Sequence, residues 1–163
     1  MDDSAACAAT RYANQVHATV ERLAIAKRWP LVLADGNVLL PTGRGIGGLL
    51  VDARLGERVE AALPALALST DLWAFLVDTT DAARSPLPPR MRLLDNGHHL
   101  PLPPSVTADG PVRWIHEPTD HLPRLATVLR LLTPFAPTVT VPRPGRWCPP
   151  QHPRPAANAT TPR

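Results

Sequence analysis

The aspartates are the residues of this sequence best suited to chemistry, and they are scattered along the chain. Phosphoryl transfer with two metal ions requires carboxylates that converge within a few ångströms, commonly from two aspartates one residue apart on a strand. No Asp-x-Asp pair occurs in the 163 residues. The acids that could act in catalysis are Asp35, Asp52, Asp71, Asp78 and Asp95, and we expect all five to be solvated turn residues. Asp52 and Asp95 are the weak candidates for catalysis.

The histidines do not predict a metal site. His98 and His99 are adjacent, so on a strand they would point to opposite faces. His116 and His121 are five residues apart with Pro118 between them, whereas the metalloprotease helix needs two histidines one helical turn apart. We therefore expect no metal and no other cofactor. Ser69 and Ser105 lack the adjacent base that a hydrolase nucleophile needs, so no hydrolase triad is expected.

A glycine-rich segment, residues 43–48, formally matches the G-x-G-x-x-G pattern. In dinucleotide-binding folds such glycines let backbone amides approach a pyrophosphate at the start of a helix. Here Gly56 interrupts any helix that follows, and no βαβ unit surrounds the segment. We expect a plain glycine turn, with a nucleotide cradle as the alternative.

Composition indicates one domain followed by a basic, proline-rich end. Hydrophobic side chains make up 44% of the chain, enough for one core. We expect a flexible start at residues 1–9, a folded domain at 10–133 and a disordered tail at 134–163, where nine residues are proline. Residues 121–163 carry six arginines and no acid. Such an end can attract polyanions, although a solvated tail is the simpler interpretation.

The location of the protein is expected to be cytoplasmic, without a membrane partner. No run of about 18 apolar residues occurs that could cross a bilayer, and no secretory signal is visible. Cys7 and Cys148 are expected to be free thiols.

Hydrophobic patterns predict helices at both ends of the domain. Residues 10–28 carry an apolar stripe that ends before Pro30, and residues 121–132 carry another, with Asp120 as the expected cap. Residues 57–67 also show helical spacing. Of the four tryptophans, we expect the first three to pack in the core, namely Trp29, Trp73 and Trp114.

Strands are predicted between these helices. Residues 31–33 and 37–40 form an expected hairpin, residues 49–51 fit a strand or a helix start, and the apolar run at 72–77 predicts a central strand. Asn96-Gly97 predicts a tight hairpin turn between two short strands, and a further strand contains Trp114. This order predicts an α+β domain with a mostly antiparallel or mixed sheet, packed with the N- and C-terminal helices.

A family resemblance lies mainly in the later part of the domain. Its motifs are residues 95–100 (DNGHHL), 103–105 (PPS), 109–110 (DG) and 112–114 (VRW), preceded by residues 26–32, 42–45 and 49–52. Over about residues 12–133 the chain resembles the bifunctional DNA primase/polymerase domain of the archaeo-eukaryotic primase superfamily. It is most similar to the short stand-alone actinobacterial members.

Departures from the family pattern imply a degenerate active site. The family holds divalent metal with two acids one residue apart. Here residues 52–54 keep one acid on one alignment, and residues 37–40 keep none on another. The histidine of the second motif is absent from residues 70–75. Losing a metal-binding carboxylate removes charge stabilisation worth several kcal/mol.

The resemblance implies a non-catalytic accessory protein of DNA replication or mobile DNA. Its partners would be DNA or a nucleotide, or a replication or mobile-element protein. The arginines expected to contact nucleic acid are Arg44, Arg54, Arg90, Arg92 and Arg113. One alternative is a residual nucleotidyltransferase that uses Mg²⁺ or Mn²⁺ at Asp52 and Asp95. The other is a protein–protein adaptor whose Pro-rich tail is an extended ligand.

Overall fold

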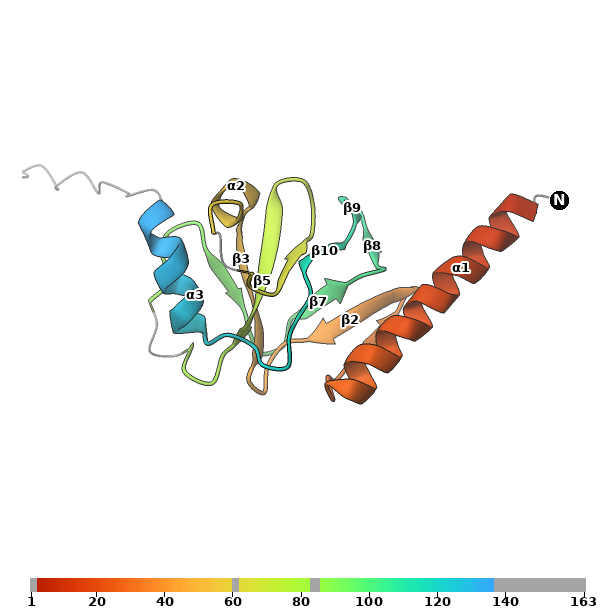
Figure 1. The fold of residues 1–163 in the computed structure, drawn as a ribbon, viewed down its shortest axis with the longest axis horizontal. Coiled ribbons are helices and arrows are strands. Elements are labelled where there is room, and N and C mark those ends of the chain that lie inside the picture. Colours follow the sequence, from red (N-terminus) through yellow and green to blue (C-terminus); the bar gives the residue numbers. More distant parts are fainter. Residues whose placement is uncertain (1–2, 60–61, 83–85, 137–163) are drawn as a thin grey trace, which may run out of the picture.

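The computed structural model describes residues 3–59, 62–82 and 86–136, which form an α+β domain (Figure 1). The strands form three sheets, and each pairing between them is antiparallel. A helix lies on each side of the largest sheet (Figure 1). The predicted fold class is therefore confirmed, while the expected tail lies almost entirely outside the described residues.

The largest sheet has five strands in the order β10-β4-β5-β3-β6. Its long members are β3 (Ile46–Asp52) and β5 (Leu72–Asp78), which pair along their whole lengths. The shorter members are β4 (Ala65–Ala67), β6 (Arg92–Leu94) and β10 (Arg113–His116). The apolar run of β5 lies in the middle of this sheet, as predicted, and residues 49–51 belong to the strand β3.

The second sheet has the order β1-β2-β7, with β1 (Val32–Ala34), β2 (Asn37–Pro41) and β7 (His99–Leu102). The expected β1–β2 hairpin is confirmed. A small hairpin of β8 (Val106–Thr107) and β9 (Gly110–Pro111) follows β7. Buried Ser105 joins these parts, because its hydroxyl accepts from the Val38 amide at 2.8 Å and donates to the Val38 carbonyl at 3.1 Å.

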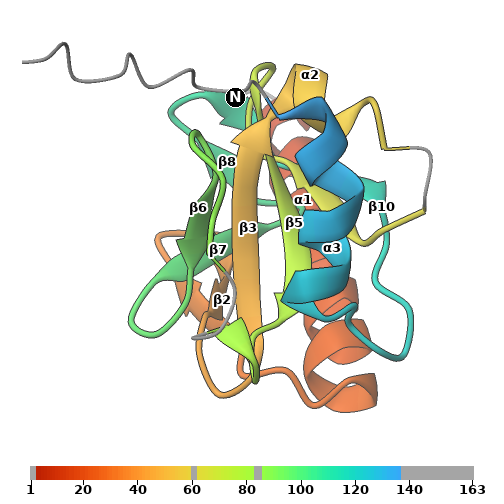
Figure 2. The same cartoon turned by 90° about the vertical axis from the view of Figure 1, so that its left-hand side faces the viewer.

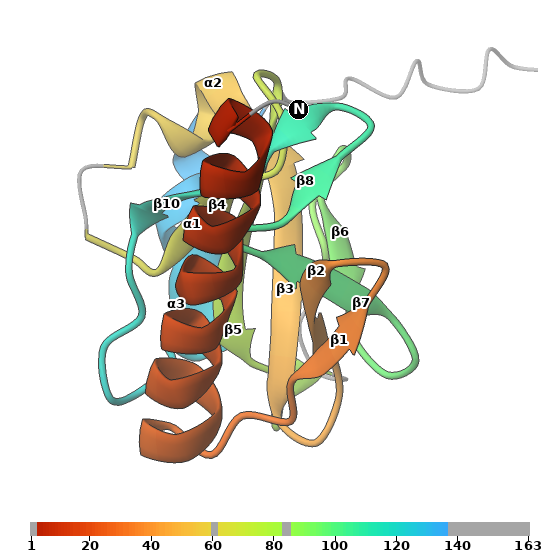
Figure 3. The ribbon, with the colours of Figure 1, turned by 90° about the vertical axis from the view of Figure 1, so that its right-hand side faces the viewer.

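Helices lie on both sides of the five-stranded sheet, and on the side of α1 the three-stranded sheet also packs against it. Helix α3 (Leu125–Leu132) lies over one face and ends in a 3₁₀ turn, Thr133–Phe135 (Figure 2). Helix α1 (Asp3–Val20), which continues as a π-helical turn, Glu21–Ala26, lies on the other side (Figure 3). One core cluster therefore includes Leu23, Leu66 and Leu76, and the other includes Phe75 and Leu132.

The predicted hairpin at Asn96-Gly97 is wrong. Strand β6 pairs with β3, and β7 pairs with β2, so the turn connects two different sheets. Thr42 contacts the turn in this arrangement: its amide donates to the His98 carbonyl at 2.9 Å and its hydroxyl contacts the Asp95 and His98 carbonyls. The turn is thus held against the β2–β3 connection.

Three of the helix predictions also differ from the structure. The predicted helix at residues 57–67 is wrong: the structure has a short α2 (Ala53–Gly56) and then β4. Pro64 lacks the amide hydrogen that a helix interior needs. Helix α1 begins at Asp3 rather than Thr10. Helix α3 begins at Leu125 with Arg124 as its N-cap, and Asp120 instead lies 3.5 Å from Lys27 Nζ.

Candidate nucleic-acid interface

The two candidate catalytic acids lie at opposite ends of the β3–β6 pairing. Asp52 is the last residue of β3, whereas Asp95 directly follows β6. Because Gly48 pairs with Leu94, Asp95 continues the register to the level of Gly47. The two aspartates are therefore separated by about five strand residues, or roughly 16 Å. The structure does not bring them together.

Asp71 lies closer to Asp52, but each acid serves a local turn. The Ala53 amide donates to the Asp71 carbonyl at 2.9 Å, which places both acids at one end of the sheet. The Asp52 carboxylate accepts from the Arg54 amide at 2.9 Å and caps α2, while the Asp71 amide donates to Ser69 Oγ at 3.2 Å. Among the described residues, no group of three or more His, Cys, Asp or Glu side chains could hold a metal ion.

The five predicted nucleic-acid-binding arginines do not form one surface. Arg44 lies at the tip of a two-residue turn, beside a hollow that Asp78 and Arg124 also line. The positive φ values of Arg44 and Gly45 (51° and 91°) give the tight glycine turn predicted for this segment, and a strand follows it. Arg113 lines a different hollow, against the side chains of α1.

Arg54 and Arg90 share a third hollow with residues from distant parts of the chain. This hollow, which we call the arginine groove, has a volume of about 250 Å³. It is lined by Asp52, Arg54, Leu55, Arg58, Pro89, Arg90 and Phe135. Arg92 is exposed on β6, two residues beyond Arg90, and does not line it. The groove therefore combines two of the predicted arginines with Arg58 and Phe135, which the sequence reasoning missed.

Local turns position the first two arginines of the groove. The capping bond from Arg54 to Asp52 starts α2, and the Glu57 amide continues it by donating to the Ala53 carbonyl at 2.9 Å. The Arg58 amide then donates to the Leu55 carbonyl at 3.3 Å. This winding brings Arg54 and Arg58 to one side. Their four-residue spacing could have indicated this, but Gly56 between them suggested a break.

Arg90 and Phe135 reach the groove through anchored neighbours. Arg90 adopts the left-handed conformation (φ 68°), in a turn that the Met91 amide closes by donating to the Pro88 carbonyl at 3.2 Å. Met91 itself is buried in the core that α3 covers. Phe135 belongs to the 3₁₀ turn after α3, and 42% of it stays exposed. No sequence pattern marked this aromatic side chain as a site residue.

The charges of the groove are unbalanced. Three arginines line it, and Asp52 is the single acidic side chain among the described residues that line it. Within the part of the chain that the structure describes, none of the three guanidinium groups forms an ion pair. All three arginines are exposed. The groove therefore presents a net positive charge to solvent, next to an exposed aromatic ring.

No family model matches the chain, and neither the curated proteins nor the solved structures contain a match. The resemblance to the primase/polymerase domain thus stays a prediction from the residues. No helix in the described ranges has the length and apolar character needed to cross a membrane.

Proposed function

We propose that this protein is a non-catalytic nucleic-acid-binding accessory module, similar to a degenerate primase/polymerase domain, that binds DNA through the arginine groove. One observation carries the proposal: Arg54, Arg58, Arg90 and Phe135 come from three separate segments and line the same hollow. Guanidinium groups bind phosphate through paired hydrogen bonds. Aromatic side chains beside a basic groove are typical platforms for bases.

The positions of the acids support a non-catalytic role. A residual nucleotidyltransferase would need Asp52 and Asp95 to share a divalent ion, and the strand register separates them by roughly 16 Å. The Asp52 carboxylate is also engaged at the start of α2. We therefore favour the binding module over the enzyme.

The sequence after Phe135 supports the choice of a polyanionic partner. Residues 137–163, which lie outside the described structure, contain four arginines and no acid. In the sequence, this segment comes shortly after the 3₁₀ turn Thr133–Phe135, whose Phe135 lines the groove. Positive charge adjacent in the chain would add a salt-sensitive attraction for nucleic acid.

The test is a binding titration with single- and double-stranded DNA across a series of salt concentrations. We expect the affinity of the wild-type protein for at least one of the two to fall steeply as salt rises. Replacing Arg54, Arg58 and Arg90 together by Ala should weaken that binding. The matched control replaces Arg44, Arg92 and Arg113 together by Ala, because it removes the same amount of charge from exposed arginines that do not line the groove. Absence of salt-sensitive affinity in the wild-type protein, or equal losses in both variants, would overturn the proposal.

A further inference from the structure

The size of the arginine groove limits what it can hold. Its volume of about 250 Å³ lies below the range of roughly 300–1,000 Å³ that is usual for sites of drug-sized ligands. A double helix can rest on such a surface but cannot enter the hollow. The groove therefore fits a phosphate with its adjoining sugar or base, rather than a length of duplex.

The charge of the groove distinguishes a terminal phosphate from an internal one. Among the described residues, three arginines and one aspartate line the hollow, which leaves two positive charges uncompensated among these side chains. An internal phosphodiester carries one negative charge, whereas a phosphate monoester carries about 1.5 to 2 negative charges near pH 7. The monoester is thus the better electrostatic match. Its extra oxygen also provides one more acceptor for the forked donors of arginine.

Phe135 adds a preference for an unpaired end. Its ring lines the same hollow and is 42% exposed. A base that is free of a complementary strand can turn onto such a ring. A base at a blunt duplex end is already stacked and paired, so it gains less.

We propose that the arginine groove binds the terminal phosphate monoester of a single nucleic-acid strand, with the adjoining base against Phe135. This inference rests on the proposed nucleic-acid-binding function. Arg54, Arg58 and Arg90 hold the phosphate, and Asp52 limits the excess of positive charge. The monoester can be at the 5′ or the 3′ end, since both present the same chemical group.

The experiment compares four labelled DNAs of one sequence by fluorescence anisotropy with the full chain. They are a single strand with a 5′ phosphate, one with a 3′ phosphate, one with hydroxyls at both ends, and a blunt duplex with 5′ phosphates. We expect one phosphorylated single strand to bind about tenfold tighter than the hydroxyl-ended strand, as one charged hydrogen bond would give. The arm that shows this gain identifies the end.

Variants assign the gain to the groove. Arg58→Ala and Arg90→Ala should abolish the preference for the phosphorylated strand, whereas Arg113→Ala should preserve it. Phe135→Ala should reduce the preference for the single strand over the duplex. Phe135→Tyr, which keeps an aromatic ring, should show the same preference as the wild-type protein. Thermal unfolding of each variant establishes that it is folded.

The outcomes separate this inference from the function on which it rests. If hydroxyl-ended and phosphorylated strands bind equally, and the arginine variants weaken both, the terminal-phosphate site is overturned while the nucleic-acid-binding module stands. A preference that persists in Arg58→Ala and Arg90→Ala also overturns the site. If no DNA binds the wild-type protein, both proposals fall.

Discussion

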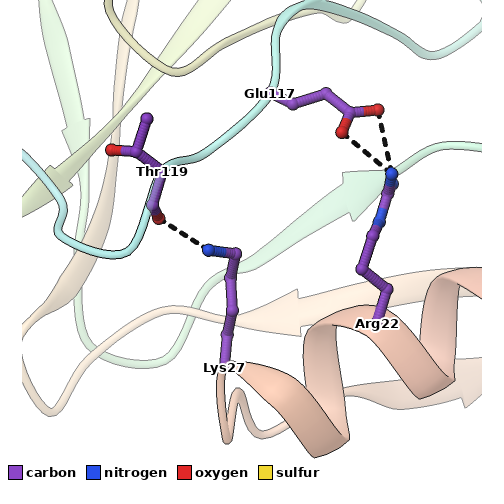
Figure 4. A network of polar contacts seen from close by, with 4 residues as sticks. All are labelled: Arg22, Lys27, Glu117 and Thr119. Carbon is purple, nitrogen blue, oxygen red and sulfur yellow. Dashed lines mark hydrogen bonds and ion pairs between the residues drawn. The ribbon is translucent and has the colours of Figure 1, made fainter.

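Two clusters of positive side chains in this domain have opposite surroundings. At the end of α1, Arg22 Nη1 donates to both carboxylate oxygens of Glu117 at 2.8 and 3.0 Å, and Lys27 Nζ donates to the Thr119 carbonyl at 2.7 Å (Figure 4). We call these contacts the α1 tether. In the arginine groove, three arginines line a hollow with no ion pair among the described residues.

The surroundings of a positive side chain indicate whether it stabilises the fold or is available to bind an external anion. The α1 tether joins the π-helical turn to the segment that leads into α3, so its positive side chains stabilise the contact between these two segments. Among the described residues, no ion pair links the guanidinium groups of the groove to another element. Charges that stabilise nothing within the described structure remain available for an external anion.

The largest expected effect is on DNA binding when the groove loses its three arginines. Replacing Arg54, Arg58 and Arg90 together by Ala should weaken binding by about 3 kcal/mol or more, because each removes a charge-assisted contact to phosphate. The free energy of unfolding should change by no more than about 0.5 kcal/mol for each substitution, as for other surface positions. Anisotropy titrations and urea unfolding measure the two quantities. A large loss of stability would mean that these arginines also serve the fold.

Gly56→Ala should break the platform that carries the groove. A Cβ atom at Gly56 would lie 2.4 Å from Cε3 of the Trp73 indole, well inside contact distance. We expect a loss of about 1–3 kcal/mol in the free energy of unfolding, typical of overpacking, together with weaker DNA binding. A smaller side chain at position 73, in the double variant Gly56→Ala with Trp73→Leu, tests the cause. Additive effects of the two substitutions would show that the clash is absent.

Lys27→Met should affect only the fold. The Lys27 side chain is 17% exposed, and Met keeps its apolar stem while removing the bond to the Thr119 carbonyl and the Asp120 pair. We expect a loss of about 1–2 kcal/mol in the free energy of unfolding, since a bond from a charged donor is lost at a partly buried position. Urea denaturation measures it. DNA affinity should stay at the wild-type value. A drop in affinity without a drop in stability would contradict the assignment of Lys27 to the fold rather than to binding.

Arg22→Met is the matched substitution at the more exposed contact of the α1 tether, and its expected effect on the free energy of unfolding is smaller. Its side chain and that of Glu117 are 46% and 56% exposed, so solvent and salt screen the pair. We expect a cost below about 1 kcal/mol that diminishes at high salt. A cost equal to that of Lys27→Met at every salt concentration would contradict the role assigned to burial.

The sequence predicted those elements whose signal is local. The continuous apolar run of β5 identified a central strand, and the segments at residues 31–33 and 37–40 identified the β1–β2 hairpin. Asn96-Gly97 correctly predicted a turn but not its partners, because the strands on its two sides pair with β3 and β2, which lie more than forty residues away in the sequence. Spacing alone likewise did not reveal that Gly56 must pack against Trp73.

The candidate site was predicted only in part, for the same reason. Arg54 and Arg90 were expected, on resemblance and placement, to contact nucleic acid, and both line the groove. Arg44 and Arg113 lie beside other hollows. Arg58 and Phe135 join the groove because α2, the turn before β6 and the end of α3 meet in three dimensions. No local pattern in the sequence predicts that these three segments lie close together.

The central claim, that unpaired arginines of the groove bind nucleic acid, is tested most directly by one titration. Single-stranded DNA is titrated with the wild-type protein and with Arg58→Ala over a range of salt concentrations. We predict tighter binding by the wild type, and a slope of log affinity against log salt that is shallower by about 0.7 in the variant, the value for one lost phosphate contact on a single strand. Identical affinities and identical slopes for the two proteins would contradict the account.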